Sequence, residues 1–202
     1  MVIRQTSAEI DRAILDAAAR TFAMHGFART SVQQVADTVD YSKTGLLHRF
    51  PSKQALYDAT IAATTEVVER VLADAAAAPA GRSRTIAMLD AAGRLAQTQP
   101  GIAVLLLEST RPRSLDPARE QLNAMAVGLV EMLSGPDAGP ERWLRSVLAL
   151  RLIVDGVLSQ DHEDARRLDP DSLQRLIVEL AAGVLGLDPP LHRPTRPLGE
   201  TS

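Results

Sequence analysis

The sequence predicts an all-α protein, and three observations support this fold class. The twelve prolines of the 202-residue chain lie between segments of helical spacing or in the C-terminal tail, as expected because proline disrupts a helix interior. The segments between the prolines are rich in alanine and leucine, and their apolar residues recur at helical intervals. Residues that cap helix N-termini precede several of these segments.

The first two predicted helices each begin with a capping box. Thr6 and Glu9 start a helix over residues 7–24, which Gly26 ends. Ser31 and Gln34 start a second helix over residues 32–39.

Two more helices follow from serine caps and a proline. Ser42 is the N-cap of a short helix over residues 42–49, which cannot continue through Pro51. Ser52 is the N-cap of a long helix that runs without a breaker to about residue 78. Asp40, between the second and third helices, tolerates the left-handed geometry that a tight turn requires.

The remainder of the chain predicts further helices and a tail. A short, nearly all-apolar helix over residues 101–109 should be buried, and Asp116-Pro117 and Asp169-Pro170 are N-terminal signals. The predicted helices cover residues 82–97, 101–109, 117–134, 140–159 and 170–186. Residues 188–202 hold four prolines and predict a disordered tail. We therefore expect a head of residues 1–51, a body of residues 52–187 and a tail of residues 188–202.

Composition excludes several classes of protein. The chain has no cysteine, and hence no disulfide, thiolate nucleophile or cysteine metal site. No apolar run approaches the length of a membrane span, and no signal sequence is visible, so a cytoplasmic protein is expected. Asp161-His162-Glu163-Asp164 is more typical of a solvated linker than of a metal site, because consecutive residues rarely converge on one ion. We expect neither a metal nor a cofactor.

Charge is distributed unevenly along the chain. Residues 1–53 carry a formal charge of +2 and residues 54–202 carry −5. Both lysines of the protein, Lys43 and Lys53, lie in the first segment. Because phosphate contacts depend on where cations lie, the net charge of −3 does not exclude DNA binding.

The two short helices predict a helix-turn-helix that reads the DNA major groove. Ala36 allows them to cross closely, while apolar residues such as Val35 and Leu46 fill the core between them. The second helix then exposes Lys43, Thr44, Gly45 and His48. Glycine is costly in a helix interior, by about 1 kcal/mol relative to alanine, which favours close approach of this helix to another surface.

This region resembles the tetracycline-repressor (TetR) family of bacterial transcription regulators over residues 8–56. The resemblance includes Gly26-Phe27, Thr30-Ser31-Val32, Val35-Ala36, Ser42-Lys43, Gly45-Leu46, Phe50 and Ser52-Lys53. It implies a three-helix DNA-binding head, a linking fourth helix, an all-α ligand-binding body and a homodimer formed by the last two helices. Three residues depart from the pattern: Asp40 replaces a glycine, Tyr41 replaces a valine, and Leu47 replaces a tyrosine that commonly contacts phosphate.

Position within the pattern assigns roles in DNA binding. Phosphate contacts are expected from Thr30, Ser42, Arg49 and Lys53, and base contacts from Thr44, Gly45 and His48, with Lys43 able to serve either purpose. Ser31 is a further expected DNA-binding residue. Leu47 would touch a thymine methyl group or fill core. Lys53 lies at the positive end of a helix dipole, a conflict that a bound phosphate would remove; the alternative is a side chain that points into water.

The body shows no catalytic motif, and we expect it to hold an apolar effector pocket. Candidate lining residues are Met88, Leu95, Leu105, Leu106, Met125 and Trp143, although each could equally be core. Polar groups that could anchor an effector, or simply form salt bridges, are Glu108, Arg111, Arg151 and Asp155.

Apolar stripes on the last two long helices predict a two-fold dimer interface. The candidate interface residues are Val147, Val154, Leu158, Leu173, Ile177, Leu180 and Val184.

These patterns together predict a ligand-responsive transcriptional repressor. It would bind a near-palindromic double-stranded DNA operator as a homodimer and be released by a small-molecule effector of unknown identity. Two alternatives remain open from the sequence: a small all-α enzyme that uses a cavity in the body, and a helical protein-interaction module.

Overall fold

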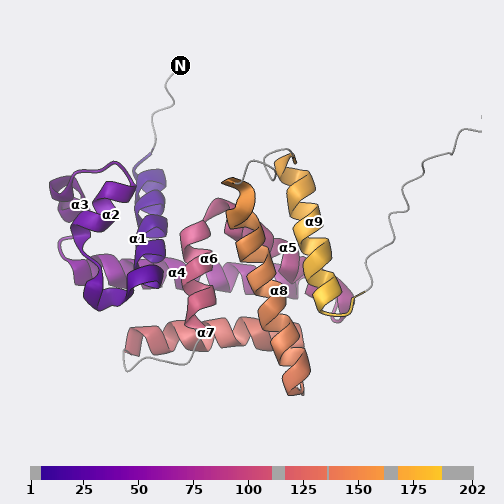
Figure 1. Cartoon of the computed structure of the whole chain (residues 1–202). Coiled ribbons are helices and arrows are strands. Elements are labelled where there is room, and N and C mark those ends of the chain that lie inside the picture. Colours follow the sequence, from indigo (N-terminus) through magenta and orange to yellow (C-terminus); the bar gives the residue numbers. More distant parts are fainter. Residues whose placement is uncertain (1–5, 111–116, 136, 162–167, 188–202) are drawn as a thin grey trace, which may run out of the picture.

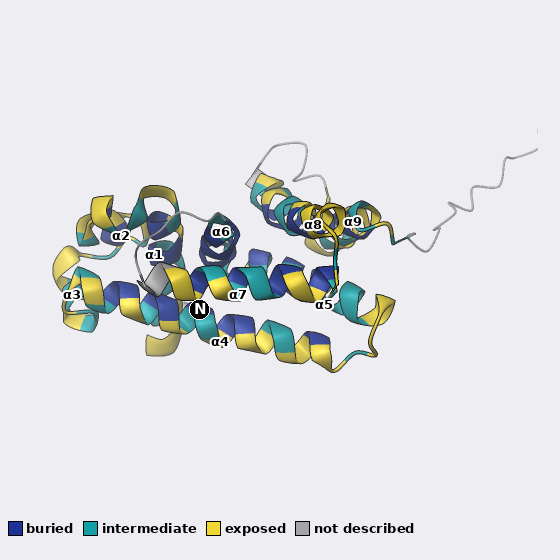
Figure 2. Ribbon diagram, turned by 90° about the horizontal axis from the view of Figure 1, so that it is seen from below, coloured by how far each residue is buried: buried dark blue, intermediate teal, exposed yellow. Residues whose placement is uncertain are grey.

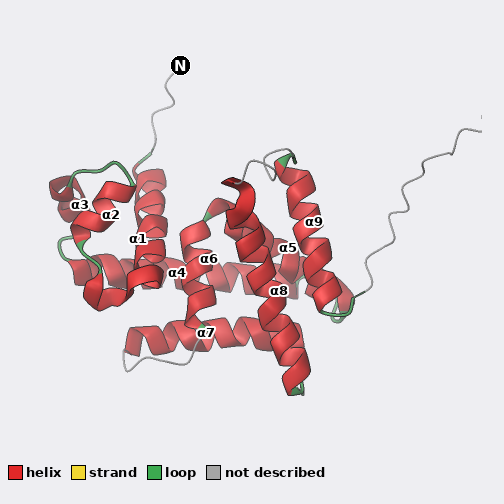
Figure 3. Cartoon of the chain, in the orientation of Figure 1, coloured by secondary structure: helices red, strands yellow, loops and turns green. Residues whose placement is uncertain are grey.

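A computed structural model describes residues 6–110, 117–135, 137–161 and 168–187 of the chain. Within these ranges all regular structure is helical, which confirms the predicted fold class (Figure 3). The predicted N-cap Asp116 and the predicted tail lie outside the described residues.

The helices form a head at one end of the molecule and a layered body at the other (Figure 1). The head contains α1, α2 and α3, and α4 extends from beneath it along the body. Helices α8 and α9 lie side by side at the far end. The bounds are α1 Ser7–Arg29, α2 Val32–Thr38, α3 Lys43–Arg49, α4 Lys53–Ala76, α5 Arg82–Thr98, α6 Pro100–Ser109, α7 Pro117–Ser134, α8 Pro140–Leu158, a short 3-10 helix Ser159–Asp161 and α9 Pro170–Val184.

Local capping begins the helices where the sequence predicts. The side chains of Thr6, Ser31, Ser42, Ser52 and Asp169 each accept a hydrogen bond from a backbone N–H in the first turn of the helix that follows. Both predicted capping boxes are complete. These caps satisfy N–H groups that have no partner within a helix.

Gly26 interrupts α1 but does not end it. Its φ of 75° and ψ of 161° produce a kink, after which one further turn continues to Arg29. The backbone N–H and the hydroxyl of Thr30 both donate to the carbonyl oxygen of Gly26, at 3.2 and 2.9 Å. This bonding extends the helix beyond the predicted end at residue 24.

The buried side chains form a single hydrophobic core that passes through head and body. Ile14 and Leu46 belong to its head region, and Leu89 and Ile153 to its body region. Buried positions line the inner faces of the helices, while the outer faces of α4, α8 and α9 are exposed (Figure 2). The predicted burial of α6 is confirmed, since most of its residues are inaccessible to solvent.

Two further properties follow from the described ranges. No helix there is long and apolar enough to cross a membrane. In the same ranges, no three acidic or histidine side chains are grouped so that they could hold a metal ion; residues 162–164 of the acidic segment lie outside them.

Candidate nucleic-acid interface

The turn between α2 and α3 fixes the angle of the second helix. Asp40 has a φ of 51°, the left-handed geometry that the sequence predicts for it. The N–H of Tyr41 then donates to the carbonyl oxygen of Ala36 at 3.0 Å, which closes the turn. Val35, Ala36 and Leu46 are fully buried between the two helices. This arrangement presents the opposite face of α3 to solvent.

The solvent-facing side of α3 carries basic and hydroxyl side chains. Lys43, Thr44 and His48 are exposed, and Ser42, also exposed, caps the helix through its hydroxyl. In the part of the chain that the structure describes, no hydrogen bond engages the side chains of Lys43, Thr44 or His48. These donors and acceptors are therefore available for a partner, as base readout requires.

Helix α2 adds polar side chains next to this face. Ser31 and Gln33 are exposed, and the Gln33 amide donates to Asp37 at 2.6 Å. Gln33 was not among the residues predicted from the sequence. The signal that could have identified it is its position between the helix cap and the buried Val35.

Contacts within the protein explain why residue 45 is a glycine. A β-carbon there would lie 3.0 Å from Cε1 of the Tyr41 ring and 3.0 Å from the hydroxyl oxygen of Ser42. Glycine thus leaves room for the tyrosine that replaces the smaller valine of the family pattern. The proposed close approach to DNA is not needed to account for it.

Arg49 links α3 to α1 and is not free on the surface. Its guanidinium forms an ion pair with Asp11 and donates to the hydroxyl of Ser7 at 3.0 Å. It also lies over the Tyr41 ring, 5.9 Å from the ring centroid. Hydrogen bonding to Tyr41 and then to Asp11 raises the pKa of Arg49. The predicted phosphate contact would have to share a cation that already holds the recognition helix in place.

Lys53 is also bound within the protein. Its ammonium donates to the carbonyl oxygens of Phe27 at 2.9 Å and Ala28 at 3.4 Å, and lies 4.4 Å from the Phe27 ring centroid. These carbonyls belong to the last turn of α1, where a cation is favoured. The carbonyl oxygens of α1 therefore compensate for the unfavourable position of the Lys53 charge at the positive end of the α4 dipole, and no bound phosphate is needed.

Two other predicted contact residues differ in exposure. Thr30 is buried, and its hydroxyl is occupied by Gly26, so it lies beneath the surface that the other residues form. Leu47 is half-buried, next to the fully buried Leu46. Ser31, Ser42, Lys43, Thr44 and His48 are thus the predicted contact residues that are exposed.

The body contains a small apolar cavity of about 50 Å³ between α5, α6, α7 and α8. Among its lining residues in the described ranges, Thr110 alone is polar, and the main lining side chains are Leu95, Leu106, Leu107, Leu129, Leu150 and Val154.

Of the residues that the sequence suggested for an effector pocket, Leu95 and Leu106 line this cavity. Met88 and Leu105 do not line the cavity. They are buried in the hydrophobic core, where neighbouring side chains cover them. Trp143 and Asp155 are exposed on α8, and Met125 accepts a contact from the Thr65 hydroxyl at 3.7 Å.

Glu108 and Arg151 form an ion pair at 3.9 Å, which agrees with the salt-bridge interpretation. Arg111 lies outside the described residues.

The predicted dimer residues differ in their exposure within the protomer. Val147, Val154, Leu173 and Ile177 are buried within the protomer, because α8 and α9 pack on each other and on α5. Leu158 and Val184 are partly buried, and Leu180 alone is largely exposed. The exposed apolar side chains of the same two helices are Trp143, Leu144, Leu148, Leu176 and Leu180. The apolar side chains that face outward on α8 and α9 are therefore mostly other residues than those predicted, and the dimer itself remains a prediction.

A capped helix held by a tight turn against a second helix, with its outer face polar and basic, defines a helix-turn-helix protein. Residues 14–60 match the profile described as bacterial regulatory proteins of the tetR family. The HTH-type transcriptional regulator RutR of Escherichia coli strain K12 is 50% identical over 50 residues, which cover 25% of this chain and 24% of RutR. Residues 14–60 therefore carry the sequence pattern of the tetR family. The match spans about a quarter of the length of its curated relatives.

Solved structures share the fold over most of the chain. The ketosteroid regulator KstR2 of Mycobacterium tuberculosis has a TM-score of 0.54 and 19% identity, covering 92% of this chain and 97% of its own. FadR of Bacillus subtilis, solved with stearoyl-CoA, has a TM-score of 0.50 and 17% identity, covering 84% and 96%. At these identities the likeness establishes the fold alone.

Proposed function

We propose that this protein is a ligand-responsive transcriptional repressor that binds a near-palindromic DNA operator as a homodimer. The observation that carries the proposal is the exposed face of α3, where Lys43, Thr44 and His48 lie on a helix that the turn and Arg49 hold rigidly. Lys43 and His48 suit acceptors on guanine, and the methyl group of Thr44 suits that of thymine. Ser31 and Ser42 are placed to donate to phosphates on either side.

The homodimer would form through the exposed apolar side chains of α8 and α9. Leu144 and Leu148 lie one helical turn apart on α8, and Leu176 and Leu180 do so on α9. Pairing with the same face of a second copy would cover all four residues in a two-fold arrangement. The two recognition helices would then enter successive major grooves, about 34–36 Å apart.

The effector would have an apolar portion that enters the cavity between α5, α6, α7 and α8. Leu106, Leu129 and Leu150 offer it apolar contacts, and Thr110 offers a single hydroxyl at the edge. Repression would be relieved if the effector binds better to a conformation in which the two heads no longer match the operator.

Selection of bound fragments from genomic DNA tests the proposal. We expect enrichment of sites with two-fold sequence symmetry, bound at low salt and progressively released as salt rises. Recovery of no preferred sequence, with equal binding to unrelated DNA, would contradict it. Neighbouring genes of a recovered site would indicate the chemistry of the effector.

A further inference from the structure

The ring of Tyr41 lies where α3 has no side chain at position 45. A β-carbon on Gly45 would lie 3.0 Å from Cε1 and 3.2 Å from Cδ1 of this ring. Successive residues of a helix are turned by about 100°, so Gly45 and Arg49 form a row beside the exposed Thr44 and His48. The half-buried ring therefore borders the face of α3 that we propose reads DNA.

The last residue of α3 fixes the Tyr41 ring in this place. The Arg49 guanidinium lies over the ring, 5.9 Å from the ring centroid. Arg49 is itself held by α1, because it pairs with Asp11 and donates to the hydroxyl of Ser7 at 3.0 Å. A side chain that is already ordered in the free protein loses little conformational entropy when it binds a partner. Tyr41 is therefore preorganised at the edge of α3.

The phenol hydroxyl of Tyr41 keeps a hydrogen that it can donate. Its hydrogen bond with Arg49 uses the phenol oxygen as acceptor, since a guanidinium has donors only. Within the described ranges, no acceptor takes the hydrogen of this hydroxyl. Hydrogen bonds in a chain polarise one another, so the bond from Arg49 strengthens the hydroxyl as a donor. An anionic oxygen, such as that of a phosphate, is the acceptor that forms the strongest bond with it.

Arg49 is less suited than Tyr41 to meet a phosphate directly. Its guanidinium is already shared between Asp11 and Ser7, and its side chain is only 23% exposed. The Asp11 carboxylate on the same guanidinium is more open, at 41% exposed, and would repel an approaching phosphate. The hydroxyl of Tyr41 can donate without breaking the ion pair between Arg49 and Asp11.

We propose that the Tyr41 hydroxyl donates to a DNA phosphate beside the recognition helix, and that Arg49 is the positioning residue that holds the ring there. The inference rests on the proposed function, because it assumes that DNA meets the exposed face of α3. It assigns to Tyr41 the phosphate contact that the sequence predicts for Arg49. Such a contact fixes the register of α3 on the duplex and carries no sequence information.

Tyr41→Phe tests the hydroxyl, because it keeps the ring beside Gly45 and under Arg49. We expect the affinity for a duplex selected from genomic DNA to fall by about tenfold. An unrelated duplex should lose affinity by the same factor, since a phosphate contact does not depend on sequence. The salt dependence should keep its slope, because a neutral hydroxyl displaces no counterion. Fluorescence anisotropy measures the affinities, and thermal unfolding checks that the variant is folded.

A double-mutant cycle tests the positioning role of Arg49. Arg49→Gln should weaken binding by about fivefold or more in the wild type, but by less than about twofold in a Tyr41→Phe background. If Arg49→Gln does not fold, Arg49→Lys, which keeps a cation for Asp11 but not the planar group over the ring, takes its place with the same expectation. Losses that simply add would mean that Arg49 acts independently of Tyr41, and would overturn this role.

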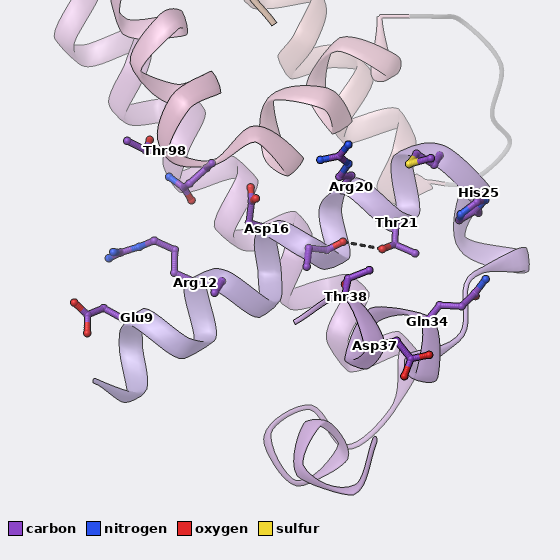
Figure 4. Close-up of a pocket in the computed structure, with 14 residues that line it drawn as sticks. Glu9, Arg12, Asp16, Arg20, Thr21, His25, Gln34, Asp37, Thr38 and Thr98 are labelled. Carbon is purple, nitrogen blue, oxygen red and sulfur yellow. Dashed lines mark hydrogen bonds between the residues drawn. The ribbon is translucent and has the colours of Figure 1, made fainter. Parts of the chain in front are cut away.

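The matched control for the lost charge is Arg12→Gln. Arg12 is a cation of α1 that lines a cleft of about 910 Å³ together with Asp16 and Arg20 (Figure 4). Its removal should change DNA affinity by less than about twofold. A loss as large as that of Arg49→Gln would mean that any cation of the head has this effect, which would contradict a specific role for Arg49.

The outcomes separate the inference from the proposed function. If Tyr41→Phe binds both duplexes as tightly as the wild type does, the inference fails and the proposed function stands. A loss confined to the selected duplex would mean that Tyr41 contacts a base, and would overturn the phosphate contact. If the wild-type protein itself does not prefer the selected duplex, the proposed function fails and the inference fails with it.

Discussion

The ammonium of Lys53, in the first turn of α4, lies 2.9 Å from the carbonyl oxygen of Phe27 in the last turn of α1. One cation thus joins the positive end of one helix to the negative end of another and fixes the start of the linking helix against the head. The sequence predicts a phosphate contact for this lysine, and its bond to Phe27 makes the two roles distinguishable by experiment.

Lys53→Gln should lower the free energy of unfolding by about 1–2 kcal/mol, because it removes charged hydrogen bonds to Phe27 and Ala28. Urea unfolding measures this loss. The salt dependence of DNA binding should keep its slope if Lys53 acts within the protein. A slope reduced by about one per protomer, with stability unchanged, would instead support a direct phosphate contact.

Gly45→Ala should destabilise the protein even though alanine favours helix by about 1 kcal/mol. The added β-carbon would lie 3.0 Å from the Tyr41 ring, over which the Arg49 guanidinium of the same helix lies. In a Tyr41→Val background the same substitution should be stabilising, since the ring contact is gone. Thermal or urea unfolding of the four variants gives the coupling, and a stabilising Gly45→Ala in both backgrounds would contradict this account.

Leu148→Glu and Leu180→Glu should convert the protein to a monomer without unfolding it. These side chains are 46% and 51% exposed in the protomer, so a charge costs little there but would be buried in the proposed dimer. Sedimentation equilibrium measures the assembly state. Met132→Glu, at a 39% exposed site on α7, is the matched control and should leave the dimer intact. A wild-type protein that is monomeric when bound to DNA would oppose this part of the proposal.

Asp16 should make stability depend on pH in the acidic range. Burial raises its pKa above the ordinary value of 3.8, against opposing hydrogen bonds from the Ile102 and Gly101 amides. The folded state then keeps the proton to higher pH than the unfolded state does, so the free energy of unfolding falls as pH rises through this window.

Asp16→Asn removes this titration. Urea unfolding of both proteins at several pH values should show the wild-type stability, relative to the variant, declining as pH rises above 3.8 and then levelling. A relative stability that increases over the same range would mean that the amide hydrogen bonds outweigh burial.

Features set by neighbours in the sequence were predictable. The capping boxes of Thr6 and Ser31, and the left-handed Asp40, depend on residues three or fewer positions away. Features set by tertiary packing were not. Asp11 and Arg49 are 38 residues apart, and nothing in either segment indicates that they pair.

The same limit explains why most of the predicted dimer residues on α8 and α9 are buried within the protomer. Helical periodicity identifies an apolar stripe such as Leu173 and Ile177, but both a core and an interface produce that pattern. Only the packing of α9 on α8 shows that Ile177 is buried while Leu180 is exposed. A β-carbon added to Gly156, on α8, would lie 3.0 Å from Cδ1 of Ile177, so the two helices are in close contact there. The proposed division at residues 51 and 52 remains a prediction, because one core joins the head and the body.

The most direct test of the central claim is the affinity of the wild-type protein and of Lys43→Ala for a selected duplex, measured by fluorescence anisotropy over a range of salt concentrations. Lys43 is exposed on α3, so its removal should leave thermal stability within about 0.5 kcal/mol. We expect Lys43→Ala to weaken binding to the selected duplex by about tenfold or more and to reduce discrimination against unrelated DNA. Equal binding of both proteins to selected and unrelated duplexes would contradict the assignment of α3 as the recognition helix.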